Sequence, residues 1–403
     1  MLIKRRTFIK MGSIASGSLF MPKILHASER FGDLAKSHHK VLVVLQWSGG
    51  NDGLNTIIPI QNDIYYKTRP TIAIKSQDAL RLQDDVALNP HLPFLKALYD
   101  EGSLAILNNV GYENPNRSHF RSMDIWQSAS QSDEVWQTGW IGRFLDKHAS
   151  INKQRALALE VDDTLSLALK GQHEKALASL DLQRLHRNTQ QSYLKAIDQV
   201  HHQLHQRHHE KPVDYLYQTM ASTLQQVDYL YKNSHPIGQH TSYPSTGLGK
   251  SLKAISSLIL SEVETKIYYV SIGSFDTHNN QNRRQELLFK QINSALQSFV
   301  NDLKANNRFR DVLICTFSEF GRRVAQNASN GTDHGTANNM FFISGGLHQP
   351  GLLNEMPDLN KLIEGDLIHQ VDFKSVYATL LDRWLDTDYR PILKAKYPLL
   401  NFI

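Results

Sequence analysis

Five polar segments of the sequence combine carboxylates, imidazoles and arginines with tight turns. They hold Asp52 in SGGNDGLN, Ser118 in NPNRSHF, Asp276 and His278 in FDTH, Glu319 and Arg322 in SEFGRR, and Asp333 and His334 in GTDHG. Carboxylate oxygens and imidazole nitrogens suit zinc, or manganese and magnesium where oxygen predominates. Two such ions a few Å apart would clamp a phosphate or sulfate ester and stabilise its attacking and leaving oxygens. These residue types therefore predict a site for one or two divalent metal ions and an anionic ester.

The predicted metal ligands each have a structural alternative. The expected ligands are Asp52, Asp276, His278, Glu319 and His334. Asp52 could instead shape a glycine turn, and Asp276 could cap the following helix through its side-chain oxygen. Glu319 could form a surface ion pair with one of the arginines that follow it. The residues alone leave these alternatives open.

Ser118 is the candidate nucleophile, because it follows a Pro-Asn turn and precedes the helical pattern HFRSMDIWQSA. Its hydroxyl would then lie at a helix N-terminus, where an anionic group is stabilised. The alternative is that Ser118 only caps this helix. Arg117 and Arg322 are candidates for bidentate binding of an anionic substrate group, or have structural roles.

Five short apolar runs predict the strands that must position these residues. They span residues 40–47, 103–110, 266–272, 311–317 and 339–346. Such runs, apolar at nearly every position, are typical of parallel strands covered on both faces. Long helical patterns, such as residues 281–307, alternate with them. This alternation predicts an α/β fold with a doubly wound, mostly parallel sheet.

The polar segments take a consistent position relative to the predicted strands. Four of them directly follow the first four runs, and GTDHG lies just ahead of the fifth. Because ligands bind beyond the carboxyl ends of strands in open α/β sheets, the segments are expected to meet at one edge. Residues 164–240 lack strand signals and are polar and helical, which predicts an insertion or cap laid against the sheet.

The first 27 residues indicate an export signal. They have a basic start, KRRTFIK, a short and weakly apolar stretch, and small residues near a plausible cut after Ala27. The paired arginines resemble the twin-arginine signal, which implies the twin-arginine export machinery as a partner and a periplasmic or secreted protein. An ordinary basic N-terminus or an uncleaved anchor is the alternative. Glycines and serines interrupt the apolar stretch, which is shorter than the ~20 residues that span a bilayer, so no stable span is expected in the mature chain.

Charge and cysteine content exclude other classes of protein. The formal net charge is +5, and five bases without any acid lie in the predicted signal, so residues 28–403 are nearly neutral. Such a chain offers no basic field for nucleic acid, and a nucleic-acid partner is not expected. The single cysteine, Cys315, allows no internal disulfide. We expect one α/β domain over residues 28–403, interrupted by the helical insertion.

Several longer motifs resemble one exported bacterial family. They include VVLQWSGGNDGLNTIIPI, NRSHFRSMD, SFDTHNNQ, FSEFGRR and GTDHGTANNMFFISGG. Over Val41–Trp384 the sequence resembles the family called domain of unknown function fifteen hundred and one. That family looks like a branch of the alkaline-phosphatase-like superfamily, which includes phosphatases, sulfatases and metal-dependent phosphomutases. The resemblance implies a fold of that type, but the reaction of the family is not established.

The resemblance also implies site residues by their order along the chain. The superfamily has an Asp after its first strand, which suggests Asp52, and a nucleophile that caps a helix, which suggests Ser118. Its Asp-and-His segment suggests Asp276 and His278, and its late loop histidine suggests His334. The sequence departs from the pattern twice. Asp276 and His278 stand two apart rather than four, and Glu319 is followed by Phe320 where an Asp-His pair is usual. These departures imply that one of two metal positions is altered or empty.

Two functions from different classes follow. The first is a periplasmic metal-dependent hydrolase of a phosphate or sulfate ester. The second is a non-catalytic binding or assembly protein that keeps the fold. The retained polar edge favours the first, and the incomplete metal pattern favours the second.

Overall fold

The computed structural model describes residues 39–190, 212–234 and 241–403. The chain divides into Met1–His39 and a main unit, Lys40–Ile403, and the description below concerns the main unit. The export signal predicted for residues 1–27 lies outside the described residues.

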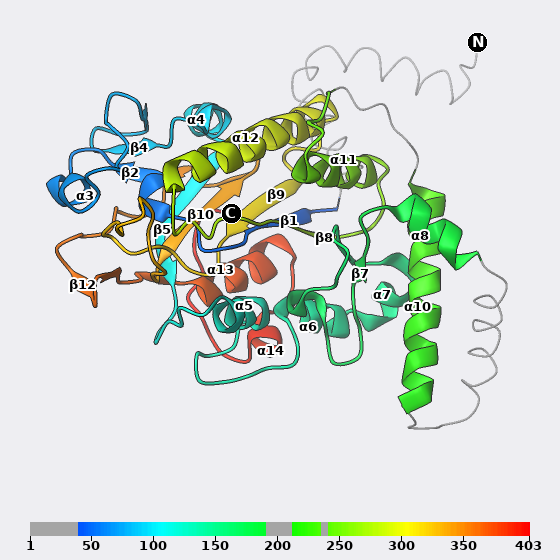
Figure 1. The fold of residues 1–403 in the computed structure, drawn as a ribbon. Coiled ribbons are helices and arrows are strands. Elements are labelled where there is room, and N and C mark those ends of the chain that lie inside the picture. The colour runs from blue at the N-terminus through cyan, green and yellow to red at the C-terminus, as the bar shows by residue number, and fades with distance from the viewer. Residues whose placement is uncertain (1–38, 191–211, 235–240) are drawn as a thin grey trace, which may run out of the picture. The chain divides into compact units, whose positions relative to one another are not determined.

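A nine-stranded sheet forms the centre of the main unit (Figure 1). Its order is β11 (Gly351–Leu352), β5 (Leu104–Gly111), β10 (Asn338–Ile343), β9 (Val312–Phe317), β1 (Val41–Trp47), β8 (Ile267–Ile272), β6 (Ala158–Glu160) and β7 (Leu177–Ala178), with β14 (Val371–Asp372) beside β5. All paired strands run parallel except β10, which is antiparallel to β5 and β9. All five predicted strands are present, and the mostly parallel sheet is confirmed.

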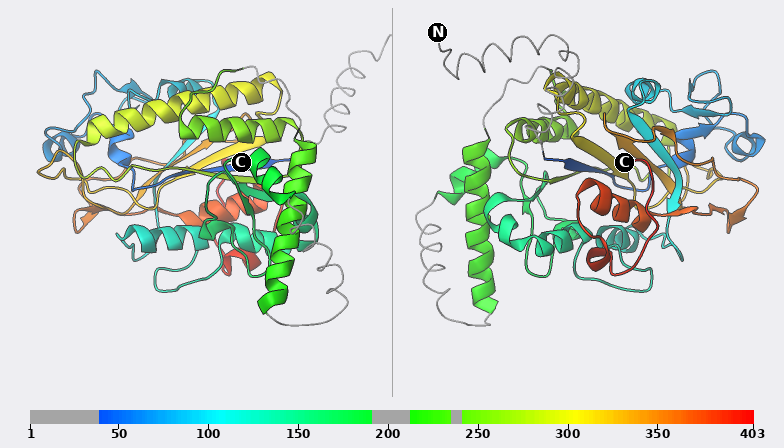
Figure 2. Two further views of the ribbon diagram at one scale, coloured as in Figure 1. Left: turned by 45° about the vertical axis from the view of Figure 1, so that its right-hand side comes forward. Right: turned by 180° about the vertical axis from the view of Figure 1, so that it is seen from behind.

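Helices cover both faces of this sheet (Figure 2). One face carries α4 (Pro93–Asp100), α11 (Gly247–Leu260) and α12 (Gln281–Ala305), and the other carries α5 (His119–Ser128), α6 (Trp140–Lys147), α13 (Phe373–Thr379) and α14 (Arg390–Leu393). Strand β1 shows why its sequence is apolar throughout. Val43 and Leu45 pack into the first of these cores, while Leu42 and Val44 pack into the second. The sheet is therefore doubly wound, as predicted.

Smaller elements extend beyond the layers. A three-stranded sheet joins β2 (Ile57–Pro59), β4 (Val86–Leu88) and β3 (Leu80–Arg81) near η1 (Gly53–Asn55) and α3 (Asp63–Thr68), and a hairpin joins β12 (Leu362–Ile363) to β13 (Asp366–Leu367). The segment η3 (Leu380–Trp384) continues α13 as a π-helix. Among the described helices, none combines the length and the apolar character needed to cross a membrane.

The described part of the predicted insertion, residues 164–240, is mainly helical. It contains η2 (Leu167–Leu169), which packs against α5 and α6, and α8 (Leu182–Thr189) and α10 (Pro212–Asn233). Helix α10 packs against α8 and α7 (Ala149–Arg155) at the β7 end of the sheet (Figure 1). One feature was not predicted. Strand β7 pairs with β6 and extends the main sheet, but its two residues are too short to give a periodic signal. The limits of the insertion and of the domain stay predictions.

Candidate metal centre

The polar segments meet at one edge of the sheet because of strand direction. β1, β5, β8 and β9 are parallel, so the segments that follow them leave at the same edge. Since β10 runs in the opposite direction, the segment that precedes it reaches this edge too. At the end of β1, Gly49 adopts a φ of 120°, and a Cβ there would lie 2.5 Å from the backbone nitrogen of Asp276. Glycine therefore lets the loops after β1 and β8 touch.

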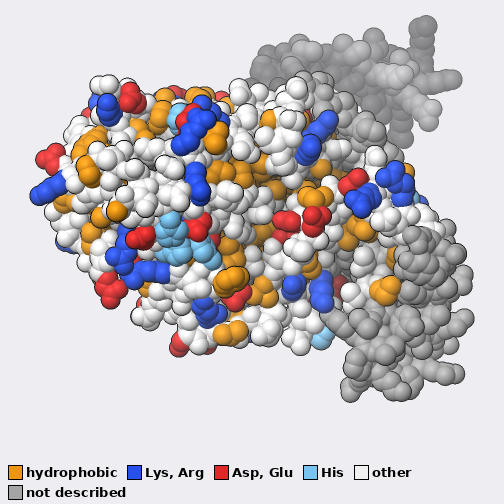
Figure 3. Space-filling model, viewed as in Figure 1, with side chains coloured by type: hydrophobic (Ala, Val, Ile, Leu, Met, Phe, Trp, Pro, Cys, Tyr) orange, Lys and Arg blue, Asp and Glu red, His pale blue; other side chains and the backbone are white. Residues whose placement is uncertain are grey.

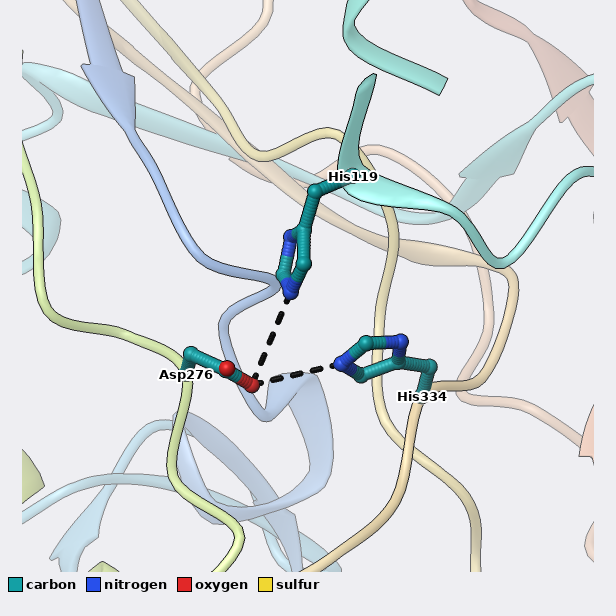
Figure 4. Close-up of side chains that lie close together, drawn as sticks. All are labelled: His119, Asp276 and His334. Carbon is teal, nitrogen blue, oxygen red and sulfur yellow. Dashed lines mark hydrogen bonds and ion pairs between the residues drawn. The ribbon is translucent and has the colours of Figure 1, made fainter. Parts of the chain in front are cut away.

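Three side chains from three of these segments form a compact cluster (Figure 4). Candidate ligand atoms of His119, Asp276 and His334 all lie within 4.8 Å of one another. Nε2 of His119 and Nε2 of His334 lie 3.6 and 3.3 Å from Oδ1 of Asp276. Nε2 of His278 lies 3.1 Å from the same oxygen and 3.0 Å from Nε2 of His334. Three imidazoles thus face one carboxylate oxygen.

The other nitrogen of each ring is held from outside the cluster. Nδ1 of His119 lies 2.8 Å from Oε1 of Glu319, Nδ1 of His278 lies 3.1 Å from Oδ1 of Asp333, and Nδ1 of His334 lies 2.8 Å from the carbonyl oxygen of Arg117. Because carbonyls and ionised carboxylates only accept hydrogen bonds, each Nδ1 must carry the hydrogen. A neutral ring then directs the lone pair of its Nε2 into the cluster, as metal-binding histidines do.

The facing atoms of this cluster repel one another when the rings are neutral. Nε2 of His119 is buried and finds no hydrogen-bond partner among the described residues. Nε2 atoms of His278 and His334 lie only 3.0 Å apart, and both also face the carboxylate of Asp276. A cation among these atoms would turn the repulsion into coordination. The cluster therefore fits a divalent metal ion, for which imidazole nitrogens and a carboxylate oxygen are ordinary ligands.

Charge around the cluster keeps its carboxylate ionised. Burial opposes ionisation of Asp276, but the Arg322 guanidinium outweighs it and lowers the pKa of this carboxyl to about 2. Burial lowers the pKa of His334, which favours the neutral, ligating form of that ring. The hydrogen bond to Glu319 raises the pKa of His119, so a proton competes more strongly there. The half-exposed Asp276 thus carries a charge at any neutral pH.

Arg322, a predicted substrate-binding residue, is buried behind the cluster. Its guanidinium donates to the carbonyl oxygens of Gly49, Gly50 and Thr332 and, at 2.7 Å, to Oδ1 of Asp276. These bonds join the loops after β1, β8 and β9. Arg322 thus positions Asp276 in the described structure.

Asp52 is separated from the cluster by its own pairing. Its side chain is only 1% exposed, and Nη1 of the fully buried Arg69 donates to its Oδ2 at 2.5 Å. Gln281 donates to the same oxygen, and the backbone N–H of Leu54 donates to Oδ1 at 3.2 Å. The guanidinium neutralises the carboxylate, and Asp52 makes no contact with the imidazoles among the hydrogen bonds and ion pairs of the described residues. The structure therefore brings Asp276, His278 and His334 together but leaves Asp52 apart.

The remaining predicted site residues surround the cluster. Glu319 is buried behind His119 and also accepts a hydrogen bond from the backbone N–H of Gly49 at 2.8 Å. Ser118 is the exposed N-cap of α5, and its hydroxyl accepts no hydrogen bond from the described N–H groups of that helix. Arg117 pairs with Asp366, to which its Nε donates at 2.7 Å. None of these three contributes an atom to the group described above.

Sequence reasoning missed the roles of His119 and Arg69. His119 lies in the quoted motif NRSHF, directly after the serine chosen as nucleophile. The sequence could have indicated this role, because His119 begins the helix that follows β5 and so lies at the same edge of the sheet as the other polar segments. Arg69 had no local signal, since only the folded chain reveals its contact with Asp52.

These elements define an α/β protein with a candidate metal centre at the carboxyl ends of its strands. The chain belongs to the family described as "Protein of unknown function (DUF1501)", whose model matches residues 39–393. This confirms the family indicated by the motifs. No curated protein matches the sequence.

Several solved structures are similar to this chain at low identity. They include the PsFucS1 sulfatase from Pseudoalteromonas sp., with 12% identity and a TM-score of 0.38 over 84% of this chain and 69% of that one. The C-terminal periplasmic domain of EcEptC from Escherichia coli has 11% identity and a TM-score of 0.35 over 76% and 74%. A protein in the alkaline phosphatase superfamily from Vibrio parahaemolyticus has 10% identity and a TM-score of 0.35 over 80% and 64%.

Proposed function

We propose that this protein is an exported metal-dependent hydrolase that acts on a phosphate or sulfate ester. One observation carries the proposal. Three imidazoles, each fixed through Nδ1, direct Nε2 toward one oxygen of the ionised and half-exposed Asp276. Histidine side chains gather on this face beside acidic and basic groups (Figure 3), so an ester in solution can reach them.

His119, Asp276 and His334 would hold one divalent cation, and His278 lies beside Asp276 and His334. Two nitrogens and one oxygen favour zinc, with manganese as the alternative, and oppose magnesium, which prefers oxygen ligands. When bound, the cation supplies positive charge that stabilises the charge developing on the ester oxygens. Arg322 keeps Asp276 ionised, and Glu319 fixes the orientation of His119.

Ser118 remains the proposed nucleophile. It precedes the ligand His119 directly, lies at the N-terminus of the ten-residue α5, and is an exposed residue. Backbone N–H groups of the first turn of α5 would stabilise an anionic group held there. The partly exposed Arg117 remains the proposed contact for that anionic group, whereas the buried contacts of Arg322 favour a supporting role.

A second function is favoured by Asp52. Because Arg69 neutralises this carboxylate, it is already compensated without a second cation. A protein of this kind could bind one ion and an anionic ligand in a binding or assembly role, without turnover.

Export is proposed from the sequence alone. The KRRTFIK motif supports recognition by the twin-arginine machinery and a periplasmic or secreted location. Fractionation of cells that produce the full chain tests this, because a chain found only in the cytoplasm would contradict it.

Metal content and ester turnover together test the proposed function. Elemental analysis of purified wild type should find about one equivalent of metal, and the His119→Ala and Asp276→Ala variants should lose it. A matched control is His91→Ala, which changes a histidine outside the cluster. Turnover of 4-nitrophenyl phosphate or 4-nitrophenyl sulfate should disappear in both ligand variants and in Ser118→Ala.

The outcomes separate the two functions. A folded wild type with neither metal nor turnover would overturn the hydrolase and leave only the binding or assembly role. Wild type that binds metal but turns over neither ester would favour the binding role, and turnover that survives in Ser118→Ala would remove only the assignment of the nucleophile.

A further inference from the structure

A cavity of about 620 Å³ adjoins the candidate metal centre. Its lining includes residues 111–117, from the last residue of β5 onward, and residues 363, 364 and 366–369, from the β12–β13 hairpin and the segment after it. Phe320 contacts both the cavity and the metal cluster. It lines the cavity, and its ring centroid lies 4.8 Å from that of His119 and 4.7 Å from that of His334. A molecule reacting at the cluster could therefore extend into this cavity.

The cavity has an apolar wall and an excess of negative charge. Ile363 and Ile368 line it and remain 62% and 42% exposed, which is unusual for large apolar side chains. Its charged lining comprises the carboxylates of Glu113, Glu364 and Asp366 and the single guanidinium of Arg117. Such a lining favours a ligand with an apolar body and a positive charge, and disfavours a negative one.

Asp366 provides the polar contact for such a ligand. The residue is 1% exposed, and its Oδ2 accepts a hydrogen bond from Nε of Arg117 at 2.7 Å. Its Oδ1 is buried without a hydrogen-bond partner in the described part of the chain, and Nε of Arg323 forms only a long ion pair with it, at 3.9 Å. Buried carboxylate oxygens are normally hydrogen-bonded. A hydrogen-bond donor on a ligand would supply the missing partner of Oδ1.

The same residues connect the cavity to the metal cluster. Arg117 pairs with Asp366 through its side chain and accepts the Nδ1–H of His334 at its carbonyl oxygen. A molecule in the cavity would therefore contact Arg117, whose carbonyl oxygen orients the candidate metal ligand His334.

We infer that this cavity binds the alcohol part of the substrate, and that this part carries an ammonium group on an apolar body. The inference rests on the proposed function for the reaction, and it adds the class of ester: one formed by an amine-bearing alcohol. Asp366 takes the ammonium, while Ile363 and Ile368 cover the apolar body.

Direct binding tests the inference without relying on turnover. Benzylamine, benzyl alcohol and benzoate share one ring and differ in the charge of their head group. Isothermal titration of the full-length protein with each should find benzylamine at least about tenfold tighter than the other two, since one charge-assisted hydrogen bond is gained. Equal binding of benzylamine and benzyl alcohol, or tighter binding of benzoate, would overturn the inference.

Variants locate the binding in the cavity. Asp366→Asn should weaken benzylamine about tenfold and abolish the preference over benzyl alcohol, whereas Asp382→Asn, an exposed acid outside this cavity, should change nothing. Ile363→Ser alters only an exposed side chain, so it should fold even if Asp366→Asn does not, and it should weaken both probes. Unchanged binding in Ile363→Ser would contradict the assignment to this cavity.

The two proposals can fail separately. Ester turnover with no benzylamine preference overturns the inferred substrate class and leaves the hydrolase. A clear benzylamine preference without any turnover keeps the amine site but overturns its assignment to a substrate.

Discussion

Asp52 and Asp276 occupy equivalent places and have different surroundings. Each follows a central parallel strand, β1 or β8, and these strands are direct neighbours in the sheet. Each accepts a hydrogen bond from an arginine. Asp52 is 1% exposed and fully paired, whereas the side chain of Asp276 is 47% exposed and faces three imidazoles. Position at a strand end therefore does not decide whether an aspartate can serve a metal ion. The charges and lone pairs around it do.

Acidification should show this difference most strongly. Arg322 keeps the pKa of Asp276 at about 2, so the imidazoles of the cluster take up protons before this carboxylate does as the pH falls. The hydrogen bond to Glu319 raises the pKa of His119, so a proton displaces metal there first, and the ring of His334, whose pKa burial lowers, takes up its proton at lower pH. Metal affinity should therefore fall from about pH 7 to 5 by several powers of ten. Metal retention after dialysis at each pH measures this. Retention down to pH 4 would mean that imidazoles are not the ligands.

Removal of Arg69 should affect stability rather than metal. Arg69→Ala leaves the Asp52 carboxylate buried without its cation, which should lower the free energy of unfolding by about 3–5 kcal/mol. Urea unfolding measures the loss, and the folded variant should keep its metal. Loss of metal at full stability would instead make Asp52 and Arg69 part of the centre.

Glu319→Gln should have the smallest effect of the three. The amide keeps the size of the side chain but holds Nδ1–H of His119 less strongly, so metal affinity should fall about 10- to 100-fold. A competition titration with a chelator measures it. Asp333→Asn is the matched control, since its exposed hydrogen bond to His278 should matter less. A larger loss in Asp333→Asn would reverse the order of importance of the two outer partners.

The sequence predicted the arrangement of segments better than the partners of individual side chains. Runs such as residues 311–317 are apolar throughout because both faces of the sheet are covered, and this pattern is visible without a structure. The shared edge followed from strand direction. The pairing of Asp52 with Arg69 could not be predicted, because the two meet only after α3 and the loop at Val324 have packed around the guanidinium.

Within the candidate site, the prediction depended on loop geometry that sequence spacing does not give. Asp276 and His278 stand two apart, yet both reach the cluster because the segment after β8 is irregular. His119 rather than Ser118 enters it, because the residue after the N-cap begins the helix. The residue that joins the cluster is therefore the one directly after the proposed nucleophile, and Ser118 stays beside it.

The reversed direction of β10 has a consequence for the order of folding. Because β9 and β10 are antiparallel neighbours, residues 318–337 form one local connection, within which Arg322 and His334 pair as an isolated bridge. This connection can assemble early, since its ends are close in the chain. We expect His119 and Asp276 to join the cluster later, because β5 and β8 pair in the sheet across long connections. Tight metal uptake during refolding should therefore be a late event that reports completion of the whole sheet.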